Sequence, residues 1–169
     1  MLLLKKFINI IEKINEAMGK GASYLIFVFM TLMVYEVIAR YFFASPTIWV
    51  HEICGQLFAG YVALTGGWVL LEKGHVAVDI IYQHFPKSGK LFADILVSFV
   101  GFFMFSILFW QGYKFAWHAV ITNQHSHTIF GPPMWPVKMM IPAGALFFLL
   151  QLTADLAKTI VKHQERSVR

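Results

Sequence analysis

The feature that most limits how this chain can fold is a succession of four long apolar runs, each about as long as a bilayer is thick. About 20 apolar residues in a helix are enough to cross the hydrocarbon core. Of the 169 residues, 58% are hydrophobic and only 14% are charged, and the mean hydropathy is +0.63. A soluble domain of this size needs more polar residues to cover its surface. The sequence therefore predicts an all-α integral membrane protein with four transmembrane helices.

The four runs also define the expected domain organisation. Polar segments that contain glycine or proline separate the runs, and these residue types end or interrupt helices. Together the runs make a four-span membrane domain over residues 21–160, and a basic tail over residues 161–169 follows it. We expect the spans at about residues 21–43, 52–71, 91–117 and 137–160.

Residues 1–20 have a different helical pattern. Apolar side chains recur every three or four residues from Leu3 to Met18, and polar side chains take the opposite face. This pattern predicts a separate amphipathic helix in the membrane surface. The alternative is a helix packed on a soluble domain, but the sequence contains no such domain. Lysines beside the apolar face are candidates for contacts with phospholipid headgroups, namely Lys5, Lys6 and Lys13.

The basic residues predict an orientation rather than a nucleic-acid partner. The net charge is +5, but the lysines and arginines lie in the gaps between apolar runs. Of these 14 residues, all but Arg40, Lys114 and Lys138 belong to the side that carries both termini and the 72–90 loop. Cytoplasmic loops carry the excess of Lys and Arg, so we expect both termini and this loop in the cytoplasm.

Two charges lie inside the first span. Glu36 and Arg40 are four residues apart, so they share a helix face and can pair. We interpret them as a structural ion pair, because the partner of the costly buried carboxylate is adjacent. The alternative is that Glu36 is a carboxylate that handles protons or ions.

The second span contains a row of small residues at intervals of four. A row of this kind lets another helix approach closely, and the partner helix can belong to this chain or to another. We predict a helix-packing interface with a larger subunit at Gly55, Ala59, Ala63 and Gly67.

The sequence predicts no catalytic residue, no metal site and no cofactor site, and so no enzyme. Cys54 is the only cysteine, and His51 with Glu52 lacks the second histidine of a zinc-protease motif because position 55 is glycine. His125 and His127 have no neighbouring carboxylate or cysteine. His51 and His118 leave a bis-histidine haem open as a minority interpretation, although every histidine is at a span end or in a loop.

Several short motifs, in order, resemble one family. They are Arg40-Tyr41-Phe42, then Trp49 and Glu52, then Gly66-Gly67, and then His75-Val76-Ala77-Val78-Asp79, which is the most specific of them. The family-motif positions are Trp49, Glu52, His75, Val78 and Asp79. This arrangement resembles the small membrane subunit (DctQ-type, Q subunit) of tripartite ATP-independent periplasmic (TRAP) transporters. The family commonly has arginine in the middle of the last motif, where this chain has Ala77.

The resemblance implies a division of labour in the bacterial inner membrane. A large multi-span subunit would hold the substrate and sodium sites, so sodium is expected there and no cofactor is expected in this chain. A periplasmic binding protein would deliver an organic acid, either a carboxylate or a sulfonate. The small subunit would be a scaffold among phospholipids, and its loops on the periplasmic side could help to dock the binding protein.

Three other functions remain open from the residues. One is a haem- or quinone-binding membrane anchor of a respiratory enzyme. Another is a small proton-coupled exporter that uses Glu36, although the neighbouring Arg40 disfavours an easily protonated carboxylate. The third is an assembly factor with no transport role.

Overall fold

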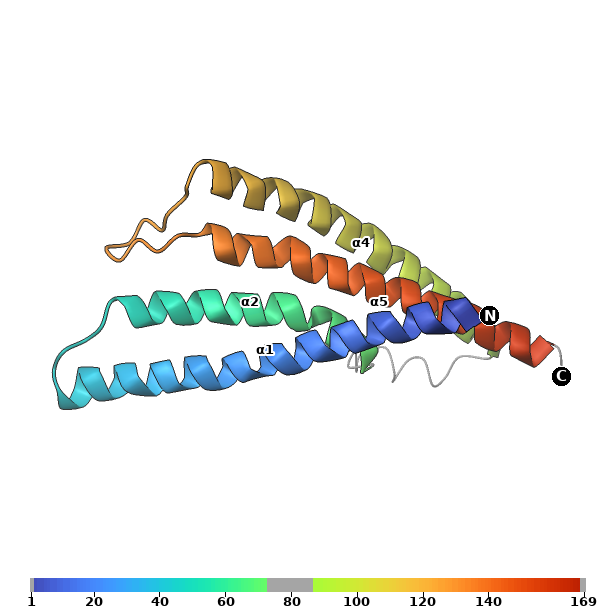
Figure 1. The fold of residues 1–169 in the computed structure, drawn as a ribbon, viewed down its shortest axis with the longest axis horizontal. Coiled ribbons are helices and arrows are strands. Elements are labelled where there is room, and N and C mark those ends of the chain that lie inside the picture. Colours follow the sequence, from blue (N-terminus) through green and yellow to red (C-terminus); the bar gives the residue numbers. More distant parts are fainter. Residues whose placement is uncertain (1, 73–86, 168–169) are drawn as a thin grey trace.

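The computed structural model describes residues 2–72 and 87–167 and shows four long helices (Figure 1). They are α1 (Leu2–Phe42), α2 (Trp49–Leu71), α4 (Lys87–Ile121) and α5 (Trp135–Ser167). Each contains a stretch long and apolar enough to cross a membrane. The predicted all-α, four-span fold is therefore confirmed.

The helices lie side by side in the order α1, α2, α5, α4 (Figure 1). Two antiparallel pairs, α1 with α2 and α4 with α5, meet where α2 packs on α5, and the first half of α1 also reaches α5. Both termini lie at one end, which we call the terminal end. The 43–48 and 122–134 connections lie at the other, which we call the turn end. Among the described helices, α4 packs along its length only on α5. It therefore forms one edge of the layer.

The predicted surface helix over residues 1–20 is wrong as a separate element. α1 continues without a break from Leu2 to Phe42 and is 41 residues long, so it measures roughly 60 Å, about twice the thickness of the hydrocarbon core. The segment contains no proline, and its glycines weaken a helix without ending it.

Tertiary contacts explain why the first half of α1 stays in line with the span. Ile8 and Ile11 are buried against Ala154 of α5. Gly19 lies so close to α2 that a Cβ there would overlap the Trp68 side chain. Buried side chains on this face of α1 thus pack on other helices of the same chain.

Small residues allow the helices to pack closely. A Cβ at Gly60 of α2 would overlap Met140 of α5, and a Cβ at Gly112 of α4 would lie 3.2 Å from Ile141 and 3.5 Å from Pro142. Ala116 and Ala119 of α4 are fully buried. The helix contacts therefore bring backbones together, which is how helices associate in a bilayer, where apolar burial gives little advantage.

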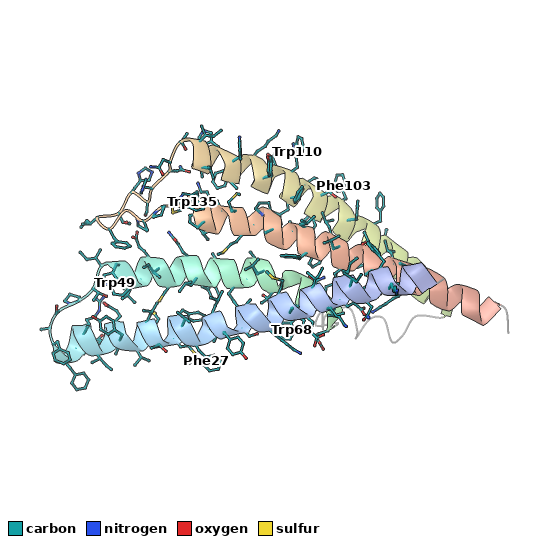
Figure 2. All side chains as sticks on the ribbon, viewed as in Figure 1. Phe27, Trp49, Trp68, Phe103, Trp110 and Trp135 are labelled. Carbon is teal, nitrogen blue, oxygen red and sulfur yellow. The ribbon has the colours of Figure 1, made fainter. Side chains whose placement is uncertain are left out.

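Large apolar side chains instead cover much of the exposed surface. Phe27 of α1 is 68% exposed and Phe103 of α4 is 61% exposed, and each projects away from the layer (Figure 2). Monomeric soluble proteins rarely expose apolar patches of this extent. The surface is suited to lipid tails and to other membrane-embedded chains.

Candidate functional site

The buried carboxylate of Glu36 joins the end of α1 to the turn that follows. Arg40 donates a hydrogen bond from Nε to Glu36 Oε1 over 3.0 Å, and its guanidinium also makes the ion pair. The backbone N–H of Thr47 donates to Glu36 Oε2 over 3.0 Å, and the Thr47 hydroxyl donates to the same oxygen. Both carboxylate oxygens therefore have partners, and the partner at Thr47 is one that the sequence reasoning missed.

The 122–134 connection forms a compact hairpin. A bridge pairs His125 with Pro133, the Ser126 backbone N–H donates to Pro132 O over 3.0 Å, and the Met134 N–H donates to Gln124 O over 2.9 Å. Gly131 has a φ of +55°, a left-handed conformation that glycine adopts without steric cost. The hairpin therefore has a defined backbone shape.

Side chains of α2 and α5 attach this hairpin to the helices. Ser126 Oγ donates to Glu52 Oε1 over 3.0 Å, and Gln56 Nε2 donates to Pro133 O over 3.4 Å. Lys138, which is 7% exposed, donates to Gln124 Oε1, and its amine lies 3.9 Å from the centre of the Phe115 ring. The family-motif residue Glu52 is thus one of the anchors of the hairpin.

Trp49, the other motif residue at this end, packs between the first two helices. It is partly buried at the start of α2, and its ring centroid lies 6.2 Å from that of Tyr35 on α1, with the planes tilted by 37°. Figure 2 shows Trp49 at the turn end. Glu36, Trp49 and Glu52 therefore gather at the turn end, where they connect α1, α2 and the hairpin.

The predicted row of small residues does not form one face. Each step of four residues turns a helix by about 40°, so the first and last members are about 120° apart. Gly67 is buried against Asn15 and Phe147, whereas Gly55 is exposed and has open space at its missing Cβ. Ala59 is exposed and Ala63 is partly buried. The row thus divides into a part packed within the chain and a part turned outward.

A polar contact at the terminal end was missed by the sequence reasoning. Asn15 of α1 is 1% exposed and Gln151 of α5 is fully buried, and Asn15 Nδ2 donates to Gln151 Oε1 over 2.9 Å. Gln151 Nε2 in turn donates to Asp155 Oδ1 over 3.2 Å. The available signal was Gln151, a lone amide in the middle of an apolar run. Burying an amide costs free energy unless it has a hydrogen-bond partner.

The remaining predicted residues fall into two groups. Lys6 and Lys13 are exposed, as a contact with lipid headgroups requires, and the Lys5 side chain lies outside the described part of the chain. His75, Val78 and Asp79 also lie outside the described residues. The histidines weighed above as metal or haem ligands are all exposed at the turn end, namely His51, His118, His125 and His127.

A comparison with protein families finds one that fits this arrangement. Residues 29–162 match the family described as "Tripartite ATP-independent periplasmic transporters, DctQ component". The match covers the turn end and the four-helix layer, except for the first part of α1 and the last turn of α5. No curated protein sequence matches the chain.

Proposed function

The chain belongs to the family of DctQ components of tripartite ATP-independent periplasmic transporters, and from this we propose that it is the static scaffold subunit of such a transporter. In the proposal a large membrane subunit carries the transport sites and uses sodium to drive uptake of an organic acid. A periplasmic binding protein delivers that acid to the membrane. The family membership shown by the sequence match gives a transporter component, and the division of roles is our inference.

The observation that carries the proposal is the use of polar side chains that are buried or partly buried. Glu36 holds the 43–48 turn, Glu52 holds the hairpin, and Asn15 holds Gln151 on another helix. Each of these contacts joins one element of the chain to another. A subunit that braces a moving partner needs this kind of internal connection, because each bond that crosses elements resists a change in their relative positions.

The same contacts disfavour a proton-coupled exporter. A proton-carrying carboxylate has to release its partners in each cycle, yet both oxygens of Glu36 are engaged, by Arg40 on one side and Thr47 on the other. A haem anchor is disfavoured by the exposure of His51 and His118 at the turn end. Axial haem ligands face one another inside a bundle.

We further propose that the turn end faces the periplasm and that both termini face the cytoplasm of a bacterium, in the inner membrane. The support is the distribution of Lys and Arg along the sequence. The hairpin then faces the compartment of the binding protein. It carries two exposed apolar side chains at its tip, Ile129 at 90% and Phe130 at 46% exposure.

The test begins with purification of the tagged full chain from its native membrane in a mild detergent, followed by mass spectrometry of the proteins that accompany it. We expect a membrane protein with roughly three times as many spans. Recovery of a redox enzyme, or of the chain alone, would contradict the scaffold proposal. The recovered complex is then placed in liposomes with the binding protein, and uptake is measured with and without an inward sodium gradient.

A further inference from the structure

The face of α4 that points away from α5 changes its chemistry along the helix. Gly112, Ala116 and Ala119 are buried toward α5. At about 100° per residue, Lys114 lies nearly opposite to them. The same outward face carries purely hydrocarbon side chains in its middle part, with exposures of 51%, 70% and 61% for Leu96, Phe99 and Phe103.

Toward the turn end the outward face becomes aromatic and basic. We call the group formed by Trp110, Tyr113, Lys114 and Trp117 the α4 belt. Its three aromatic side chains are 59%, 48% and 50% exposed. The Lys114 amine lies 4.9 Å from the centre of the Trp110 ring, and the Tyr113 and Trp117 rings are stacked with centroids 6.2 Å apart and planes within 12°. Trp110 projects outward from α4 (Figure 2).

The lysine of the belt has a ring but no carboxylate as its neighbour. In residues 6–72 and 96–158, where side chains are described, the ion pairs join Lys20 to Glu16, Arg40 to Glu36, and Lys158 to Glu12. Lys114 takes part in none of them. The belt therefore presents an exposed cation beside an indole ring, and its amine is accessible to a group outside the described chain.

We propose that the α4 belt binds the headgroup of an anionic phospholipid, with the phosphate at Lys114. The order of side chains along the outward face favours a lipid over a protein partner. Hydrocarbon side chains occupy the length of the acyl chains, and tryptophan, tyrosine and lysine follow at the depth of the headgroups, where such residues are enriched. The charge of the belt complements a net negative headgroup. Binding of lipid at the edge of the layer would hold α4 at a fixed depth.

Quenching of tryptophan fluorescence by brominated lipids tests this proposal. The full chain is reconstituted in phosphatidylcholine bilayers that contain a series of mole fractions of dibrominated phosphatidylglycerol or dibrominated phosphatidylcholine. The two quenching curves give the binding constant of the anionic lipid relative to the zwitterionic one at sites near the tryptophans. We expect a preference of about fivefold for phosphatidylglycerol, the effect of one lysine near the headgroups.

Three variants connect the preference to the belt. Lys114→Gln should remove most of it, Lys114→Arg should retain it, and Gln111→Ala, which changes an exposed neutral side chain beside the belt on α4, should leave it unchanged. Equal quenching by the two lipids in the unmodified chain would overturn the proposal, as would an unchanged preference in Lys114→Gln. Loss of the preference on assembly with the large subunit would also overturn it, since Lys114 would then meet a protein group.

Discussion

Gly144 of α5 lies directly against the backbone carbonyl of Ala63 on α2, so that a Cβ at position 144 would overlap that oxygen. The obstacle is backbone, which no change of side-chain rotamer can move. The two helix pairs of the layer therefore meet at a point where only glycine fits, and their separation is set by this contact.

Gly144→Ala should destabilise the chain although alanine is the better helix former by about 1 kcal/mol. Relief of the overlap requires α2 and α5 to move apart, and overpacking of this kind costs about 1–3 kcal/mol. The measurement is thermal unfolding in one detergent, with Gly55→Ala as the matched control because its missing Cβ faces open space. A Gly144→Ala chain that melts at or above the unmodified temperature would contradict the packing described.

A leucine at each end of the small-residue row should have different effects. Gly67→Leu should weaken the folded chain itself, since position 67 is buried against Asn15 and Phe147. Gly55→Leu should leave the melting temperature of the isolated chain nearly unchanged and reduce its co-purification with the large subunit severalfold. The second effect rests on the proposal that the exposed half of the row, Gly55 and Ala59, contacts that subunit. If Gly55→Leu assembles normally, this half of the row is not the interface.

The fold could be predicted from the sequence because the apolar runs are long and local in the chain. The error at residues 1–20 has a physical cause. An amphipathic face can pack on a membrane or on other helices, and periodicity does not distinguish the two. Here Ile8 and Ile11 meet Ala154, which is more than 140 residues away in the sequence, and that pairing decides the outcome.

The same distinction separates the site contacts that could be predicted from those that could not. Glu36 and Arg40 are four residues apart on one helix, so helix geometry alone brings them together. Asn15 and Gln151 are 136 residues apart, and Glu52 and Ser126 are 74 apart. Such pairs form only if their helices are neighbours in the fold, and the spacing of residues in the sequence does not predict which helices are neighbours.

The contact between Asn15 and Gln151 should give a measurable coupling energy. We expect Asn15→Ala and Gln151→Ala each to lower the stability, and the double variant to lose less than the sum, with a coupling of about 0.6–1.7 kcal/mol, as found for polar contacts between membrane helices. Denaturation of the four proteins in one detergent measures it. The control cycle pairs Asn15→Ala with Gln111→Ala, an exposed position on α4, and should be additive within about 0.5 kcal/mol. Equal coupling in both cycles would mean that the bond contributes nothing specific.

Variants of the ion pair at the end of α1 distinguish a structural role of Glu36 from a role in transport. Glu36→Gln and Arg40→Gln should each lower the melting temperature, and the double variant should lose less than the sum, because the second change removes a group already left without its partner. Thr47→Val, which removes the hydroxyl contact and keeps the backbone N–H, should have a smaller effect. Uptake by the assembled transporter should persist in Glu36→Gln once the protein is folded. Loss of uptake with normal stability and assembly would favour a proton-handling carboxylate instead.

The tip of the hairpin should determine how well the binding protein docks. Ile129 and Phe130 are exposed on a backbone that Glu52 and Lys138 hold in place, so the two side chains can be buried by a partner with little loss of chain freedom. Replacing both with serine should raise the concentration of binding protein needed for half-maximal uptake by about thirtyfold or more, since two buried apolar side chains at about 1 kcal/mol or more each contribute about 2 kcal/mol or more together.

The maximal uptake rate and the amount of assembled complex should stay the same in the Ile129→Ser, Phe130→Ser variant, because the hydrogen bonds that attach the hairpin to α2 and α5 involve Ser126, Pro133 and Gln124 and not the tip. The matched control is Ile121→Ser, which changes an isoleucine that is 69% exposed at the same end of the molecule but on α4. An equal shift in the control would mean that general surface polarity, and not the hairpin tip, governs docking. A lower maximal rate with an unchanged half-maximal concentration would place the tip in a later step, after the binding protein has docked.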